Sequence, residues 1–139
     1  MLYNINPNAW GEPFWNTFHI ITFAYPDNPT DTDKQNILNF FHSVKHILPC
    51  ETCRYHFEEN LTKYPLTDDI LSSRYKLVVW LITIHNDVNV RLGKSQVSVE
   101  TVIEKYTGIN TNKNKLNEWL TPLLLVILII VLITYIKLN

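Results

Sequence analysis

Cysteine is scarce in this sequence, and its placement is the first guide to function. Cys50 and Cys53 are the only two cysteines among 139 residues, and they lie close together in the segment Pro49-Cys50-Glu51-Thr52-Cys53. Two sulfurs at this spacing can form and break a small disulfide ring, and a position at the N-terminus of a helix would favour the thiolate. The pair is therefore either one redox couple or half of a metal site.

The sequence also lacks an excess of charge of either sign. Its formal net charge is -1, with 18% charged and 46% hydrophobic residues. A disordered chain would carry fewer apolar residues and more net charge, and a nucleic-acid-binding surface would need a basic field. The composition excludes both classes and indicates an ordinary folded protein.

Charge is missing altogether from residues 120–136 (LTPLLLVILIIVLITYI). This stretch is about as long as the shortest segments that cross a bilayer. A buried core helix is the alternative, but the stretch has no polar face to show to water. The first seven residues lack the basic start and the apolar run of a signal peptide. We therefore expect a single-pass, tail-anchored membrane protein.

The basic residues around the apolar stretch indicate its orientation. Lys105, Lys113 and Lys115 precede it and only Lys137 follows it, and the more basic side of a span tends to stay in the cytoplasm. The folded part is therefore expected to face the cytosol. Asn60-Leu61-Thr62 is a glycosylation acceptor that would matter only in a lumenal domain, so it offers a test of this topology.

The chain divides into a domain at residues 1–107, a polar linker at 108–118 and an anchor at 119–136. Apolar residues in the domain recur at helical spacing. A first helix should end before Pro26, because the residue before a proline avoids helical geometry. The other expected helices are a second that begins with a capping box of Thr30 and Asp33 and stops at Pro49, and three more at about 51–64, 72–92 and 99–106.

No alternating strand pattern is present, so the predicted fold class is all-α. This matters for the two cysteines, because the usual setting of a Cys-x-x-Cys redox pair is a thioredoxin-like βαβ unit. A helical redox module needs a different electron acceptor. Two cysteines hold two electrons but do not pass them quickly to oxygen, so an oxidase would need a cofactor such as a flavin.

A zinc site is the strongest alternative for the same cysteines. His42, His46, Cys50 and Cys53 are spaced as His-x3-His-x3-Cys-x-x-Cys, and zinc accepts four ligands of these kinds. Against this reading, both histidines would have to turn away from the apolar face of their helix. Pro49 would also lie within the loop that wraps the metal.

Two pairs of residues at helical spacing could make a surface for a ring-shaped cofactor. Trp15 and His19 lie four apart, as do His85 and Asn89, and Lys94 follows the second pair where it could meet a phosphate. Taken alone, Trp15 and His19 are more often core residues. Asn86 and Asn89 beside His85 favour a ligand, because polar residues on the inner side of a helix cost stability unless they have partners.

The order of these motifs resembles a known family. The blocks are Trp10-Gly11-x-x-x-Trp15-x-x-x-His19, Tyr25-Pro26, Pro49-Cys50-x-x-Cys53, and His85-Asn86-x-Val88-Asn89 with Leu92-Gly93-Lys94. Over residues 8–106 the chain closely resembles the Erv-type, FAD-linked sulfhydryl oxidases, in particular the short forms from large DNA viruses.

This resemblance implies a four-helix bundle with a short fifth helix, here followed by the membrane helix, that forms a homodimer with one FAD per subunit. It implies that Cys53 faces the flavin and that Cys50 exchanges with substrate. The residues that match FAD-contacting positions are Gly11, Trp15, His19, Tyr25, His85, Asn86, Asn89 and Lys94. Trp10, Val88, Leu92 and His56 match the edge of that set less closely.

The implied reaction is oxidation of protein thiols, with electrons passing through the cysteine pair and flavin to oxygen to give hydrogen peroxide. Many family members carry extra cysteines as a structural or shuttle pair, and this chain has neither. The resemblance therefore implies a direct partner with its own Cys-x-x-Cys, such as a thioredoxin-like protein, and attachment to an internal or virion membrane. The remaining alternative is a membrane-anchored scaffold that keeps the fold and oxidises nothing.

Overall fold

The computed structural model describes residues 5–109 and 111–138, and all regular secondary structure in these ranges is helical. The elements are α1 (Pro7–Ala24), α2 (Asp31–Ile47), α3 (Glu51–Lys63), the 3-10 turn η1 (Ile70–Ser72), α4 (Arg74–Arg91), α5 (Val99–Thr107) and α6 (Thr111–Leu138). The all-α prediction is confirmed. The chain separates into two compact units, with the boundary at Val99.

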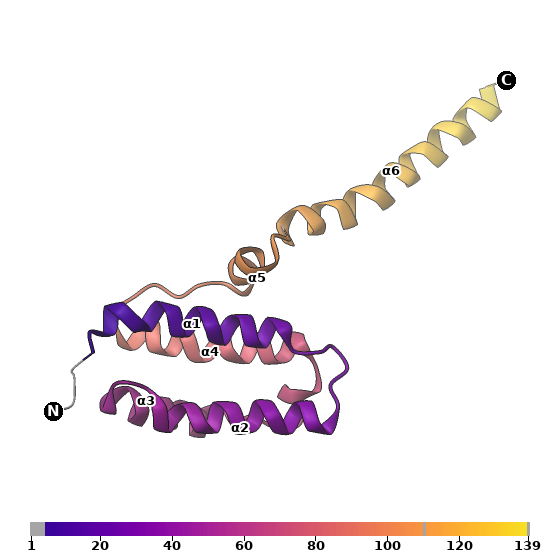
Figure 1. Cartoon of the computed structure of the whole chain (residues 1–139). Helices are drawn as coiled ribbons and strands as arrows, with labels where there is room; N and C mark the ends of the chain where they lie inside the picture. The colour runs from indigo at the N-terminus through magenta and orange to yellow at the C-terminus, as the bar shows by residue number, and fades with distance from the viewer. Residues whose placement is uncertain (1–4, 110, 139) are drawn as a thin grey trace. The chain divides into compact units, whose positions relative to one another are not determined.

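The first unit holds α1 to α4, which pack as a four-helix bundle. In Figure 1, α1 runs beside α4, and α3 folds back along α2 after the turn at residues 48–50. The η1 turn packs on α4. Aromatic side chains meet at the centre of the interior, where Phe41 is fully buried against Phe18 and Trp80. Trp80 is therefore a core residue.

Local signals in the sequence set the helix ends. Thr30 and Asp33 form the expected capping box, in which each side chain accepts a hydrogen bond from the other residue's backbone N–H. Pro26 and Pro49 follow the ends of α1 and α2. The fourth helix begins two residues later than expected, at Arg74, because Ser73 caps it and residues 70–72 form a separate 3-10 turn.

The structure differs from two expectations drawn from the sequence. The side chain of Asn60 is only 1% exposed, so a glycan could be attached there only if the domain opened, and the acceptor does not test topology. The polar segment expected as a linker is helical from Thr111 onward, continuous with α6. Residues 1–4 and the side chains of Lys113 and Lys115, used above for targeting and orientation, lie outside the described residues.

The second unit contains α5 and α6. Residues Glu118–Lys137 of α6 are long and apolar enough to cross a membrane, and none of this segment is buried against protein. Its exposed leucine, isoleucine and valine side chains would be unfavourable in water. The helix therefore has the character of a membrane span rather than of a core helix.

Candidate active site

The two cysteines form a disulfide at the N-terminus of α3. Their Cα atoms are 5.1 Å apart. Cys50 is the N-cap residue of the helix, and its Sγ accepts a hydrogen bond of 3.1 Å from the backbone N–H of Cys53. Unpaired N–H groups and the positive end of the helix dipole stabilise negative charge at this position. When the bond is reduced, the structure therefore favours a thiolate on Cys50.

The turn that carries the disulfide is fixed from both sides. Leu48 is buried, and its carbonyl accepts a hydrogen bond of 2.7 Å from the Arg54 guanidinium. Both cysteines are half-buried, and Cys53 is also packed against the bundle core. The two sulfurs thus differ in their packing against the interior of the domain.

The structure gives the zinc alternative no support. His42 and His46 are exposed on α2, and Cys50 and Cys53 are bonded to each other. Within the described ranges, no group of three or more His, Cys, Asp or Glu side chains is arranged to hold a metal ion.

The predicted ring-binding residues of α1 and α4 come together in the bundle. The ring of Trp15 stacks on the ring of His85, with centroids 4.0 Å apart and an interplanar angle of 4°. His19 is only 2% exposed. Its Nε2 lies 3.0 Å from the Nδ1 of His85. Side chains that are 66 to 70 residues apart in sequence thus form one cluster of aromatic and imidazole rings.

An aromatic layer links this cluster to the disulfide. Phe57 lies one helical turn after Cys53 on α3, so the two share a face. Its ring is 6.4 Å from that of Phe18 on α1, and Phe18 is in turn 5.9 Å from Trp15. The redox pair and the ring cluster are therefore parts of one continuous packed region.

Other residues of the predicted set have structural partners. The hydroxyl of Tyr25 donates a hydrogen bond of 3.0 Å to the carbonyl of Leu71 and is buried; burial, followed by the charge of Asp33, raises the pKa of this phenol. The side-chain amide of Asn86 accepts from Val97 N–H and donates to Val97 C=O, both at 2.9 Å. Both side chains hold the backbone of a distant segment.

The end of α4 places Lys94. Gly93 has a φ of 67°, the left-handed conformation common just past a helix end. The next N–H, that of Lys94, donates a hydrogen bond of 2.8 Å to the carbonyl of Asn89. Asn89 is buried and Lys94 is exposed, so the cation lies at the rim of the bundle. Gly11 is half-exposed on α1.

The less closely matched residues are spread more widely. His56 and Val88 are half-buried on α3 and α4, and Leu92 is exposed. The indole N–H of Trp10 is buried and has no hydrogen-bond partner within the described part of the chain. Because a buried donor without a partner is unfavourable, Trp10 marks a place where a ligand acceptor would fit.

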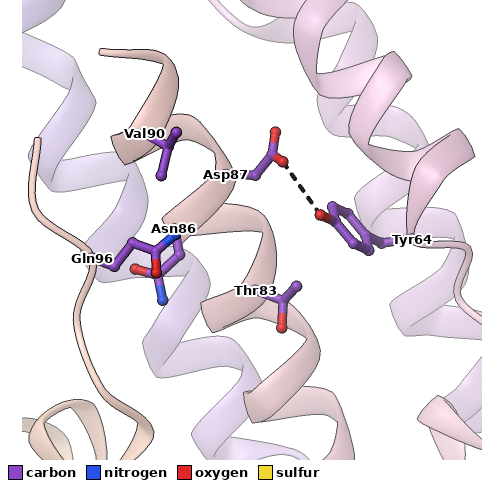
Figure 2. Close-up of a pocket in the computed structure, with 6 residues that line it drawn as sticks. All are labelled: Tyr64, Thr83, Asn86, Asp87, Val90 and Gln96. Carbon is purple, nitrogen blue, oxygen red and sulfur yellow. Dashed lines mark hydrogen bonds between the residues drawn. The ribbon is translucent and has the colours of Figure 1, made fainter. Parts of the chain in front are cut away.

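A cavity of about 310 Å³ opens between α4, the end of α3 and the segment after α4 (Figure 2). Its lining contains Asn86 but no other member of the predicted set. Asp87 accepts hydrogen bonds from Tyr64 at 3.3 Å and from Lys63 at 2.7 Å, and the bond to the Lys63 ammonium lowers the pKa of this carboxyl. A second cavity of about 470 Å³ extends from Tyr64 along the start of α4.

Asp87, which lines the first of these cavities, was not predicted from the sequence. The opposite charges of Lys63 and Asp87 were the available signal, but their separation of 24 residues does not reveal that they meet. Neither of these two cavities is lined by the disulfide or by Trp15.

The residues present fit a flavin nucleotide. They offer a ring face at Trp15, imidazole groups at His19 and His85, an unpaired indole donor at Trp10 and an exposed cation at Lys94. Aromatic faces and scattered donors suit the flavin and adenine rings, and a cation suits a diphosphate.

Three comparisons with known proteins place this site in context. The family model of the Erv1/Alr family matches residues 12–107. A probable FAD-linked sulfhydryl oxidase of Acanthamoeba polyphaga mimivirus is 42% identical over 111 residues, which cover 80% of this chain and 78% of the relative. A putative FAD-linked sulfhydryl oxidase of Invertebrate iridescent virus 3 is 34% identical over 137 residues, 92% of each chain.

The fold comparison agrees. The crystal structure of the FAD binding domain of Erv1 from Saccharomyces cerevisiae superposes with a TM-score of 0.70 at 26% identity, covering 75% of this chain and 96% of that one. The similarity in sequence and in fold covers the domain that carries the disulfide and the ring cluster.

Proposed function

Because the chain belongs to the Erv1/Alr family and is an FAD-dependent thiol oxidase, we propose that Cys50 and Cys53 are its redox-active pair. The observation that carries this assignment is the disulfide at the N-terminus of α3, joined through Phe57 and Phe18 to Trp15 and His85. These are also the only cysteines of the sequence.

The half-buried Cys50 is the sulfur that exchanges with substrate. A substrate thiolate attacks the Sγ of Cys50, forms a mixed disulfide, and breaks the Cys50–Cys53 bond, so that Cys53 leaves with the bonding electron pair. A second substrate thiolate then attacks the substrate sulfur of the mixed disulfide, and Cys50 leaves as a thiolate. Two substrate thiols become one disulfide, and two electrons remain on the pair.

The helix terminus supports the departure of Cys50. The N–H of Cys53 is directed at the Cys50 sulfur, which stabilises the thiolate that leaves in the second step. Cys53 is packed against the core and lies on the same helical face as Phe57. The site thus presents Cys50 to protein substrates and Cys53 to the interior of the domain.

FAD would be held by Gly11, Trp15, His19, Tyr25, His85, Asn86, Asn89 and Lys94. Bound FAD supplies the acceptor for the two electrons of the reduced pair and their route to oxygen, with hydrogen peroxide as product. Trp15 and His85 contribute ring faces, and Lys94 contributes a positive charge at the rim. Tyr25 and Asn86 act in part by fixing backbone, as their hydrogen bonds to Leu71 and Val97 indicate.

Substitution of each cysteine tests the assignment. Cys53→Ser and Cys50→Ser in the full-length chain, purified in detergent, should abolish oxygen consumption with dithiothreitol while the visible flavin bands remain. A scaffold would show no turnover in the unsubstituted chain either, and a zinc protein would be colourless. Continued oxygen consumption by Cys53→Ser would contradict the assignment.

The physiological partners follow from the same features. The substrates are protein thiols or a redox partner protein with its own cysteine pair, since a shuttle pair is lacking among the cysteines of this sequence. The active form is a homodimer, as the family resemblance implies. Sedimentation of the detergent-solubilised protein would detect a monomer if this is wrong.

The domain and membrane assignments complete the proposal. Residues 1–107 form the oxidase domain, 108–118 connect it to the membrane and 119–136 cross the bilayer. Support comes from the apolar, unburied segment Glu118–Lys137 and from the basic residues before it, which favour a cytosolic orientation of the oxidase domain. An internal or virion membrane is what the family resemblance implies. Protease accessibility of the domain in intact vesicles tests this orientation.

A further inference from the structure

Two large apolar side chains are exposed on either side of the redox pair. Ile47, on the last turn of α2, is 68% exposed, and Tyr55, on the second turn of α3, is 62% exposed. The structure describes α2 and α3 completely, and on these two helices no other large hydrophobic side chain is exposed. Their apolar surface is therefore concentrated beside the disulfide.

The covalent geometry of the chain keeps both residues near Cys50. Cys50 follows Ile47 by three positions, so their Cα atoms are at most roughly 11 Å apart. Tyr55 follows the N-cap cysteine by five residues, which places it about 7.5 Å further along the helix axis. An extended segment of three or four substrate residues covers roughly the same distance. A peptide whose cysteine attacks Cys50 is therefore long enough to reach these side chains.

Both side chains are held by ordered neighbours. Ile47 precedes buried Leu48, whose carbonyl is bonded to Arg54. The hydroxyl of Tyr55 donates a hydrogen bond to Glu59, and Glu59 is paired with Arg91 at 3.0 Å. A pre-ordered surface loses little conformational entropy when a ligand docks.

Some charges on the same two helices are engaged in ion pairs, although exposed Glu51 between the cysteines is not in one of them. Lys45 and Glu58 form a pair at 2.9 Å between α2 and α3, and Glu59 is paired with Arg91 as described. Paired charges at a surface contribute little attraction for a third charge. The paired charges therefore leave apolar contact as a source of selectivity at this place.

We propose that Ile47 and Tyr55 form an apolar rim that docks a large apolar side chain next to the reacting cysteine of an extended protein substrate. This inference rests on the proposed function of Cys50 and Cys53 and adds the substrate class. The rim selects reduced, locally unfolded segments, because folded proteins bury such apolar neighbours. It gives an oxidase without a shuttle pair a direct way to hold its substrate.

Two matched peptides test the proposal on the full-length protein in detergent. Both contain the same pair of cysteines and differ only in the residue before the first one, which is Leu in one peptide and Glu in the other. The unsubstituted enzyme should prefer the Leu peptide by about tenfold in kcat/KM, mainly through KM, as expected for burial of one apolar side chain.

Substitutions in the enzyme then show which residues cause the preference for the Leu peptide. Ile47→Gln and Tyr55→Ala should each bring the ratio of the two kcat/KM values close to one, while Tyr55→Phe, which keeps the ring, should preserve it. Ile20→Gln and Tyr75→Ala are controls, because Ile20 is 58% exposed and Tyr75 is 62% exposed on other helices. These controls should leave the ratio unchanged.

The possible outcomes distinguish a failure of the proposed rim from a failure of the proposed function. An enzyme that oxidises dithiothreitol but shows no preference between the peptides overturns the rim and leaves the function intact. A preference that persists in Ile47→Gln and Tyr55→Ala also overturns it, as does a change of oligomeric state in those variants, which would assign the apolar pair to a contact between copies. Failure to oxidise dithiothreitol at all would overturn both proposals.

Discussion

Gly11 is a residue at which protein stability and the proposed binding of FAD make opposite demands. It lies within α1, where glycine costs about 0.5–1 kcal/mol relative to alanine. A Cβ added there would meet nothing within 4 Å. We predict that Gly11→Ala raises the thermal stability of the FAD-free protein and lowers its affinity for FAD, because the added methyl would meet only the cofactor.

Thermal unfolding of the stripped protein and titration with FAD measure the two effects separately. Gly93→Ala is the informative contrast, since Gly93 has a φ of 67° and alanine is strained there by about 1 kcal/mol. That variant should lose stability. Unchanged FAD affinity in Gly11→Ala would remove Gly11 from the binding set.

Asn86 yields a second prediction at this scale. Its amide makes two hydrogen bonds with the backbone of Val97, so Asn86→Ala should destabilise the domain by about 1–2 kcal/mol. The Val97 amide should then exchange its hydrogen faster, as measured by mass spectrometry. Asn39→Ala is a suitable control, because this asparagine accepts a hydrogen bond from the Gln35 side chain on the exposed face of α2. Unchanged exchange at Val97 would contradict the proposed role.

Some contacts of single residues could be predicted from the sequence, and others could not. The spacing of Trp15 with His19, and of His85 with Asn89, was enough to predict a ring surface, and the structure brings Trp15, His19 and His85 together. The partner of Tyr25 could not be predicted, since it is a carbonyl 46 residues away. Any residue can supply a backbone carbonyl, so no side-chain pattern marks it.

Helices were predicted well wherever a local rule decides their ends. Proline positions and the Thr30–Asp33 capping box act over a few residues, so the sequence contains them directly. The η1 turn and the helical start of α6 were missed. A three-residue turn has no periodicity to detect, and the segment before the membrane span is too polar to show an apolar face.

The contact between α3 and α4 leads to a prediction about pH. Hydrogen bonding to Lys63, together with Tyr64 and Arg91, lowers the pKa of Asp87. A lowered native pKa stabilises the fold above the ordinary aspartate pKa of about 3.9 and loses this contribution as pH falls through the native value. Asp87→Asn should therefore be less stable than the unsubstituted protein at pH 7, by about 1 kcal/mol or less because Lys63 is largely exposed.

Thermal unfolding at pH 7 and at about pH 3 measures this effect. The difference between the two proteins should shrink at the acid pH, which lies below the ordinary aspartate pKa of about 3.9. Asp68→Asn, at an exposed turn, is the matched control for the exchange of the side chain. A gap that stays constant with pH would mean that the asparagine acts by its shape rather than by its missing charge.

At the scale of the whole molecule, the chain joins a redox domain to an apolar helix. The bundle carries the disulfide at the N-terminus of α3, and the segment Glu118–Lys137 has no burial of its own within the described structure. If that segment is held in a bilayer, substrate encounters are confined to proteins at the same membrane surface. Loss of the helix should change where the oxidase acts without changing its chemistry.

The free energy of membrane insertion decides which substitutions would release the helix from the bilayer. Of the 20 residues from Glu118 to Lys137, 13 are leucine, isoleucine or valine, and together they favour insertion by about 4–8 kcal/mol. One arginine at the centre opposes this by about 3 kcal/mol and should leave most of the protein in the membrane. Two central arginines, Ile127→Arg with Leu128→Arg, should release it.

Alkaline carbonate extraction of membranes from expressing cells measures the bound fraction. Leu120→Arg with Ile136→Arg introduces the same two charges near the ends of the segment, where long side chains reach the interface, and should remain bound. If the central double variant also stays in the membrane pellet, α6 does not span the bilayer and another surface attaches the protein. If the terminal variant is released as well, charge number rather than depth controls attachment, which is typical of a helix lying on the membrane surface.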